Sequence, residues 1–253
     1  GAVYRRKHAS WNLRDATHSE NHFQGFAQDS IRINDRLTII VGARVDKHPL
    51  IQRPIFSPRG AVVIRVGNRQ AIRASGSTAF RTFSFVESYF SLRTPSPVAA
   101  VNANGEGSVV SHRIFGRNSL NPESIVGGEV GYQNQESDRF SFDSAIFFNR
   151  VRNIINLSQN TIAYTLADYT NPAVSPYTQF DPNSNSFSFG AAGFANEPGT
   201  YYVGGLELVG RLYPADGLDI WANYSLNITY RNVGGEFLRE TRAPVHQVNA
   251  GIQ

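Results

Sequence analysis

Residues 212–230 read LYPADGLDIWANYSLNITY. Seven apolar residues recur at every second position from Leu218 to Tyr230, directly after the polar turn at 214–217. A period of two predicts a β-strand whose two faces meet different surroundings. The stretch therefore predicts a long two-faced strand that the chain enters through a tight turn.

Short polar turns alternate along the whole chain with much longer links. The turns are at 34–36, 67–69, 136–138 and 214–217, and the long links are Lys47 to Ile55, Thr82 to Ser124, Asn156 to Thr200 and Arg231 to Arg242. Up-and-down antiparallel strands with tight turns at one end and large loops at the other are typical of an outer-membrane β-barrel. The pattern predicts that the turns face the periplasm, and that the two longest links, on the outside, meet ligand.

Charge follows the same two-faced pattern. Charged residues within the predicted strands fall opposite the apolar face, which includes Ile72, Ala74 and Phe80 on one strand. An Arg or Lys facing lipid at mid-depth costs about 2–4 kcal/mol, whereas the lumen of a barrel is polar. We therefore predict a lumen wall that carries Arg44, Asp46, Arg59, Arg73, Glu129, Asp143 and Glu207.

One predicted strand does not fit. Between His22 and Ile33, Asp29 and Arg32 lie in opposite phases, and Phe26 opposes the other apolar residues. A β-bulge near Asp29 or Ser30 would reconcile these phases.

Composition excludes several classes of protein. No stretch approaches the roughly 18 consecutive apolar residues of a spanning helix, so membrane residence would require a barrel. The net charge of +4 is spread without a basic run, which argues against a nucleic-acid partner. The chain has no methionine and starts and stops within predicted strands, so we expect an internal fragment with about ten strands of a larger barrel.

The ordered landmarks of the chain resemble those of TonB-dependent outer-membrane receptors, which are 22-stranded active transporters with an internal plug. They are residues 42–46, 57–59, 79–82 with Glu87 and Tyr89, 120–123 with Glu129, Gly131 and Tyr132, 147–150, 205–208, 214–218 and 243–246. The resemblance covers nearly the whole chain, although Phe83 stands where the family commonly has proline. It implies that residues 1–253 are part of an antiparallel barrel domain, without plug or TonB-contacting box.

The resemblance also implies a function. A receptor of this kind takes up a scarce ligand such as a ferric siderophore across the Gram-negative outer membrane, with energy from TonB. The implied partners are outer-membrane lipid, the TonB complex acting through the plug, and a small molecule such as a siderophore, haem or an oligosaccharide. A passive porin-like barrel and, less favoured, a soluble β-sandwich binding module remain as alternatives.

Candidate ligand contacts lie in the two longest links. Phe80, Arg81, Glu87 and Tyr89 mark the start of the first link, where Arg and aromatic residues suit anionic or conjugated ligands, although an anchor for the loop is the favoured interpretation. His112 could ligate haem iron, but an uninvolved loop histidine is favoured. The second link offers Tyr164, Tyr169 and Tyr177, and its Phe187, Phe189 and Phe194 predict a local hairpin.

Motifs for catalysis and metal binding are missing from the sequence. It contains no catalytic triad, phosphate loop or cysteine cluster, and the other histidines share no metal-ligand spacing. We therefore expect no enzymatic activity, no cofactor and no metal site.

Overall fold

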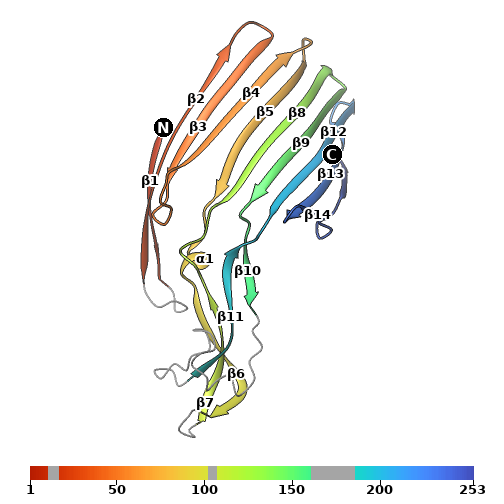
Figure 1. The fold of residues 1–253 in the computed structure, drawn as a ribbon. Helices are drawn as coiled ribbons and strands as arrows, with labels where there is room; N and C mark the ends of the chain where they lie inside the picture. The colour runs from red at the N-terminus through yellow and green to blue at the C-terminus, as the bar shows by residue number, and fades with distance from the viewer. Residues whose placement is uncertain (11–16, 102–106, 161–185) are drawn as a thin grey trace.

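The computed structural model describes residues 1–10, 17–101, 107–160 and 186–253. Its main feature is one curved sheet in the strand order β1-β2-β3-β4-β5-β8-β9-β12-β13-β14, with β15 also paired to β13 (Figure 1). The bounds are β1 Ala2–Ala9, β2 His18–Arg32, β3 Leu37–Lys47, β4 Ile55–Arg65, β5 Gln70–Arg81, β8 Glu123–Ser137, β9 Phe140–Arg152, β12 Thr200–Ala215, β13 Leu218–Val233, β14 Glu236–Arg239 and β15 His246–Ile252.

Strand number and direction confirm the predicted fold class. All neighbours in the main sheet are antiparallel. β14 pairs with residues 230–233 of β13 and β15 pairs with residues 220–226, so these two short strands share one edge position. The sheet therefore has the ten strand positions that the sequence predicts.

The four short turns join β2 to β3, β4 to β5, β8 to β9 and β12 to β13, and they lie together at one end of the sheet (Figure 1). Gly217 in the last turn has a φ of 80°, a conformation that glycine adopts without a Cβ clash. The long links leave from the opposite end. The predicted asymmetry between the two ends is confirmed.

The register of the sheet places the predicted wall charges on one face. Arg73, Ser75 and Ser77 share one face of β5. Ser77 lies opposite Arg59 on β4, and Ser75 lies opposite Glu129 on β8, so these charges share that face. The opposite face presents apolar side chains that no second layer covers within the described residues; Ile146 is 65% exposed and Phe148 is 55% exposed. A β-sandwich would bury such a stripe between two sheets.

The predicted bulge in β2 is wrong. β2 pairs with β3 without a register shift, with Asp29 opposite Val41 and Ser30 opposite Ile40. Phe26 therefore lies on the face of Arg44, while Asp29 lies on the apolar face close to the tight turn. Its carboxylate accepts a hydrogen bond from the backbone N–H of Ser30 at 2.8 Å, so the polar group has a local partner and the ladder stays regular.

The two longest links contain structure of their own. They form a second sheet in the order β10-β11-β7-β6, from β6 Ser91–Val101, β7 Gly107–Phe115, β10 Ile155–Asn160 and β11 Ser186–Asn196, and a short helix α1 Phe85–Tyr89. The predicted local hairpin is wrong, because Phe187, Phe189 and Phe194 all lie in the single strand β11. This strand pairs antiparallel with β10 and parallel with the distant β7, so tertiary pairing replaces the local one.

Among the described residues, no helix has the length and apolar character needed to cross a membrane.

Candidate functional site

A small apolar core fixes the place where the long links meet the main sheet. Phe83, Leu120 and Ile155 are at most 8% exposed, and Leu50, Ile51 and Phe194 pack against them. These residues come from the first three long links and, for Ile155, the position just before the third, so the core holds these links together. The loop bases are therefore a packed unit rather than separate connections.

Arg81 ties three elements together at this core. Its guanidinium donates to both carboxylate oxygens of Glu123 at 2.6 Å and to both oxygens of Glu87 at 3.0 Å. The last residue of β5 is thus joined to the first residue of β8 and to α1. This fork geometry supports the interpretation of Arg81 as a loop anchor.

Glu87 also helps to cap the start of α1. Its carboxylate accepts from the backbone N–H of Ser84 at 2.6 Å, while the Ser84 hydroxyl accepts from the backbone N–H of Glu87 at 3.2 Å, which is a capping box. Burial alone would raise the pKa of the Glu87 carboxyl, but hydrogen bonds from Arg81 and Ser84 outweigh it and hold the pKa below its usual range. Glu87 is therefore charged and engaged at neutral pH.

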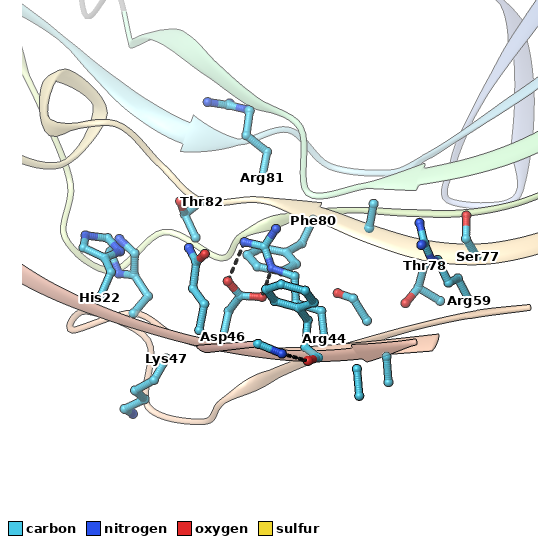
Figure 2. A pocket seen from close by; sticks show the side chains of 18 of the residues that line it. His22, Arg44, Asp46, Lys47, Arg59, Ser77, Thr78, Phe80, Arg81 and Thr82 are labelled. Atoms are coloured by element: carbon cyan, nitrogen blue, oxygen red, sulfur yellow. Dashed lines mark hydrogen bonds and ion pairs between the residues drawn. The ribbon is translucent and has the colours of Figure 1, made fainter. Parts of the chain in front are cut away.

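The two aromatic candidates also make intramolecular contacts. Tyr89 stacks on His18 with 3.9 Å between ring centroids, and the ring centroid of Phe80 lies 5.8 Å from the guanidinium carbon of Arg44. The sequence-based prediction that Phe80 lies on the apolar face is wrong, because the Phe80 ring lies beside Arg44 (Figure 2). β5 stops pairing with β4 after Ser77, while its pairing with β8 continues to Arg81, so the end of β5 is free of its β4 neighbour where Phe80 approaches Arg44.

A cavity of about 1260 Å³ opens on the charged face next to these residues (Figure 2). Strands β1 to β5 and the adjoining links line it. Its wall contains six cationic residues and one carboxylate, Asp46. The cations are Arg5, Lys7, Arg44, Lys47, Arg59 and Arg81. Excess positive charge in a concave wall attracts anions.

Part of this charge is already paired with carboxylates. Arg44 binds Asp46 through two hydrogen bonds of 2.6 Å, and Arg81 is paired with Glu87 and Glu123. Arg5, Lys7, Lys47 and Arg59 have no carboxylate partner within the described part of the chain, although Lys47 donates to the backbone oxygens of Ile51 and Gln52. These four cations carry the positive potential of the cavity.

The other predicted wall charges lie further along the same face. Arg73 pairs with Glu129, and both line a second cavity of about 390 Å³ together with Asp143 and Glu207. Two ion pairs, Arg44–Asp46 and Arg73–Glu129, thus lie among the wall charges.

Four candidate ligand contacts fall, wholly or in their side chains, outside the described part of the structure. The backbone of His112 lies in β7 opposite Thr94, and its side chain is outside the described part. Tyr164, Tyr169 and Tyr177 also lie outside the described residues. Their proposed roles stay predictions.

Sequence reasoning missed a buried cluster beside the cavity. Glu20 and His22 on β2 and His48 after β3 are 4%, 6% and 1% exposed. Burial lowers the pKa of His48 to about 4, although the charge of Glu20 opposes the shift. The only local signal was the Glu20-x-His22 spacing, which places two side chains on one face of a strand.

Comparison with known structures gives the same fold. The siderophore receptors PirA from Pseudomonas aeruginosa and from Acinetobacter baumannii are each 16% identical, with TM-scores of 0.62 and 0.65. They match 88% and 94% of this chain, but 39% and 32% of their own. A variant of the ferric enterobactin receptor PfeA from Pseudomonas aeruginosa, in complex with enterobactin, is 20% identical with a TM-score of 0.63 over 94% of this chain and 31% of its own.

The chain thus spans about a third of the length of these receptors. Comparison with curated protein sequences gives no match. The family model described as "TonB dependent receptor-like, beta-barrel" matches residues 3–253, and the barrels of that family are outer-membrane proteins of Gram-negative bacteria. This chain therefore belongs to the TonB-dependent receptor β-barrel family.

Proposed function

We propose that this chain is the barrel portion of an outer-membrane receptor that takes up an anionic iron carrier of the siderophore class with energy from TonB. The observation that carries the proposal is the cationic cavity at the base of the long links. Ferric catecholate carriers present oxygen-rich, anionic surfaces, which cationic side chains bind by charge-assisted hydrogen bonds. The structural neighbours named as siderophore receptors support the same ligand class.

The two faces of the sheet fit this role. We assign the exposed apolar face to outer-membrane lipid and the charged face to the barrel lumen, where an internal plug that contacts TonB would lie. The short turns then face the periplasm and the long links face outside. The proposal involves neither a nucleic-acid partner nor a catalytic role for the charged residues.

Uptake by the complete gene product tests the proposal. The full-length protein is expressed in a Gram-negative host that lacks its own siderophore receptors, and uptake of radiolabelled ferric catecholate and ferric hydroxamate is measured at limiting iron. We expect saturable uptake of one class in the host with TonB and none in a TonB-deficient host. Uptake that persists without TonB would instead support a passive porin-like barrel and overturn the proposal.

Charge substitutions test the cavity itself. R5Q combined with R59Q removes two cations without a carboxylate partner, and we expect the apparent affinity for the carrier to fall about tenfold or more, since each hydrogen bond to a charged group contributes about 1.5–3 kcal/mol. The matched control R139Q removes a positive charge at the tight turn of β8 and β9, and should leave uptake unchanged. Equal affinity in the double variant would remove the cavity from the binding site.

A further inference from the structure

The buried cluster beside the cavity has the composition of a metal-binding site. One potential ligand atom from each of Glu20, His22 and His48 lies within 4.8 Å of the others. The Glu20 Oε2 atom is 2.9 Å from Nε2 of His22 and 3.7 Å from Nε2 of His48. Ligands bonded to Zn²⁺ at about 2.0–2.2 Å in a tetrahedral site lie roughly 3.3–3.6 Å apart, so small side-chain movements convert this cluster into a coordination shell.

His48 supplies an independent reason to expect a ligand. Its side chain is buried, and its Nε2 atom has no hydrogen-bond partner within the described residues. Buried polar atoms are nearly always partnered, so a buried ring nitrogen directed toward a carboxylate 3.7 Å away needs an explanation. A metal ion between the two groups gives His48 Nε2 a partner, and it replaces the hydrogen bond that Glu20 Oε2 now makes with Nε2 of His22.

The backbone holds the three residues in a fixed frame. Glu20 and His22 occupy alternate positions of β2 and share one face, and the pairing of Phe23 with Lys47 places His48 beside them. Phe83 covers His48 edge to face, with 4.9 Å between ring centroids. His22 and His48 also line the large cavity, and His22 lies at one end of it (Figure 2), which gives an ion a route of entry.

We propose that Glu20, His22 and His48 bind a first-row divalent transition-metal ion, with Zn²⁺ as the reference ion. Two imidazoles and one carboxylate form a common zinc ligand set, which leaves a fourth position open to water. The ion would cross-link the start of β2 to the link that follows β3. This inference revises the expectation of no metal site and does not depend on which carrier the receptor transports.

Two neighbouring groups affect the binding energy. Lys7 pairs with Glu20 in the β1–β2 ladder, and its positive charge opposes a cation at the site. His48 Nδ1 accepts a hydrogen bond from the backbone N–H of Leu50 at 3.2 Å, so in the neutral ring the proton is on Nε2. Metal binding at Nε2 displaces that proton, Nδ1 takes one up, and the bond from Leu50 is lost.

Metal titration of the full-length protein tests the proposal. The detergent-solubilised protein is stripped with a chelator, and bound Zn²⁺ is measured by mass spectrometry and by competition with a chelating dye. We expect the unaltered protein to bind one equivalent of Zn²⁺. In H48Q and in E20Q, we expect the affinity for Zn²⁺ to be at least about 10- to 100-fold weaker, a loss that is typical even of residues outside the coordination shell. E20Q keeps the side-chain volume, so it remains informative if H48Q disturbs packing.

His8 offers a matched control. It lies on β1 close to the cluster but is exposed and contacts the Ser19 hydroxyl at 3.0 Å, so H8Q should bind Zn²⁺ as the unaltered protein does. Co²⁺ provides a second readout, since a site with imidazole ligands gives a visible absorption band that E20Q should change. Equal stoichiometry and affinity in the unaltered protein and both ligand variants would overturn the proposal.

Discussion

Arg81 and Glu87 illustrate how one residue pair can support the base of a large loop. The two side chains form a two-pronged ion pair, and Glu87 also caps α1. Because the pKa of Glu87 is lowered in the folded protein, the pair contributes stability that is fully present above the ordinary carboxyl pKa. That stability is lost as the pH falls through the lowered pKa.

Removing Arg81 should raise the pKa of Glu87. In R81Q, only the hydrogen bonds with Ser84 offset the burial of Glu87, so we expect the pKa of Glu87 to rise relative to the unaltered protein. Titration of the Glu87 carboxyl carbon by NMR in the full-length protein measures the change. R73Q removes an arginine that pairs with Glu129 and should not alter the Glu87 midpoint; an unchanged midpoint in R81Q would contradict this account.

Residue-level predictions succeeded where the regular strand fixed the side-chain direction. The wall charges follow the period of two, so the sequence predicted their common face. Phe80 was misplaced because it lies where β5 leaves its neighbour. The cluster of His22 and His48 was missed because the β2–β3 register, which strand patterns do not reveal, brings the two residues together.

Helix α1 shows that the link from Thr82 to Ser124 is held by backbone contacts as well as side chains. The N–H of Gly116 donates to the carbonyl of Phe90 at 2.7 Å, and the N–H of Arg117 donates to the carbonyl of Glu87 at 2.8 Å. A Cβ at Gly116 would lie 2.6 Å from backbone atoms of Ser88 and Tyr89. Only glycine allows this close approach without moving the helix.

G116A should therefore loosen α1. We expect the variant to lose about 1–3 kcal/mol of local stability, the usual cost of inserting a methyl group into a packed region. Hydrogen–deuterium exchange at residues 116 and 117 measures the loss. G76A is the matched control, because a Cβ there meets the nearest atom, the carbonyl oxygen of Gly127, at an ordinary 3.8 Å; equal exchange in both variants would contradict the proposed contact.

At the level of elements, the turns were predictable and the contents of the long links were not. Each tight turn is encoded by a few polar residues between two alternating runs. β7 and β11 pair in parallel although they belong to different links, so the local sequence pattern of either strand does not reveal its partner. The bulge predicted in β2 failed for a related reason, because strand pairing tolerates Asp29 on the apolar face.

The whole molecule is a sheet with one charged and one apolar face, and this was the most predictable feature. Alternation recurs in strand after strand, and antiparallel pairing carries the phase of each strand to the next. Burial differs from that of a soluble protein: many large apolar side chains on one face are exposed, while few apolar residues are buried. Exposed apolar surface on this scale indicates a partner surface, which we assign to lipid.

A single charge placed on either face tests that assignment. Ile146 lies at the centre of β9 on the apolar face, and its neighbour Ala145 lies on the charged face between Gly131 and Glu207. If the apolar face meets lipid, I146R should lower the free energy of unfolding in bilayers by about 2–4 kcal/mol, the cost of Arg at the bilayer midplane. A145R should cost less, because its guanidinium enters a cavity lined by Asp143 and Glu207. Urea titration of the full-length protein in lipid vesicles measures both, and equal stability of the two variants would show that the apolar face does not contact the hydrocarbon core.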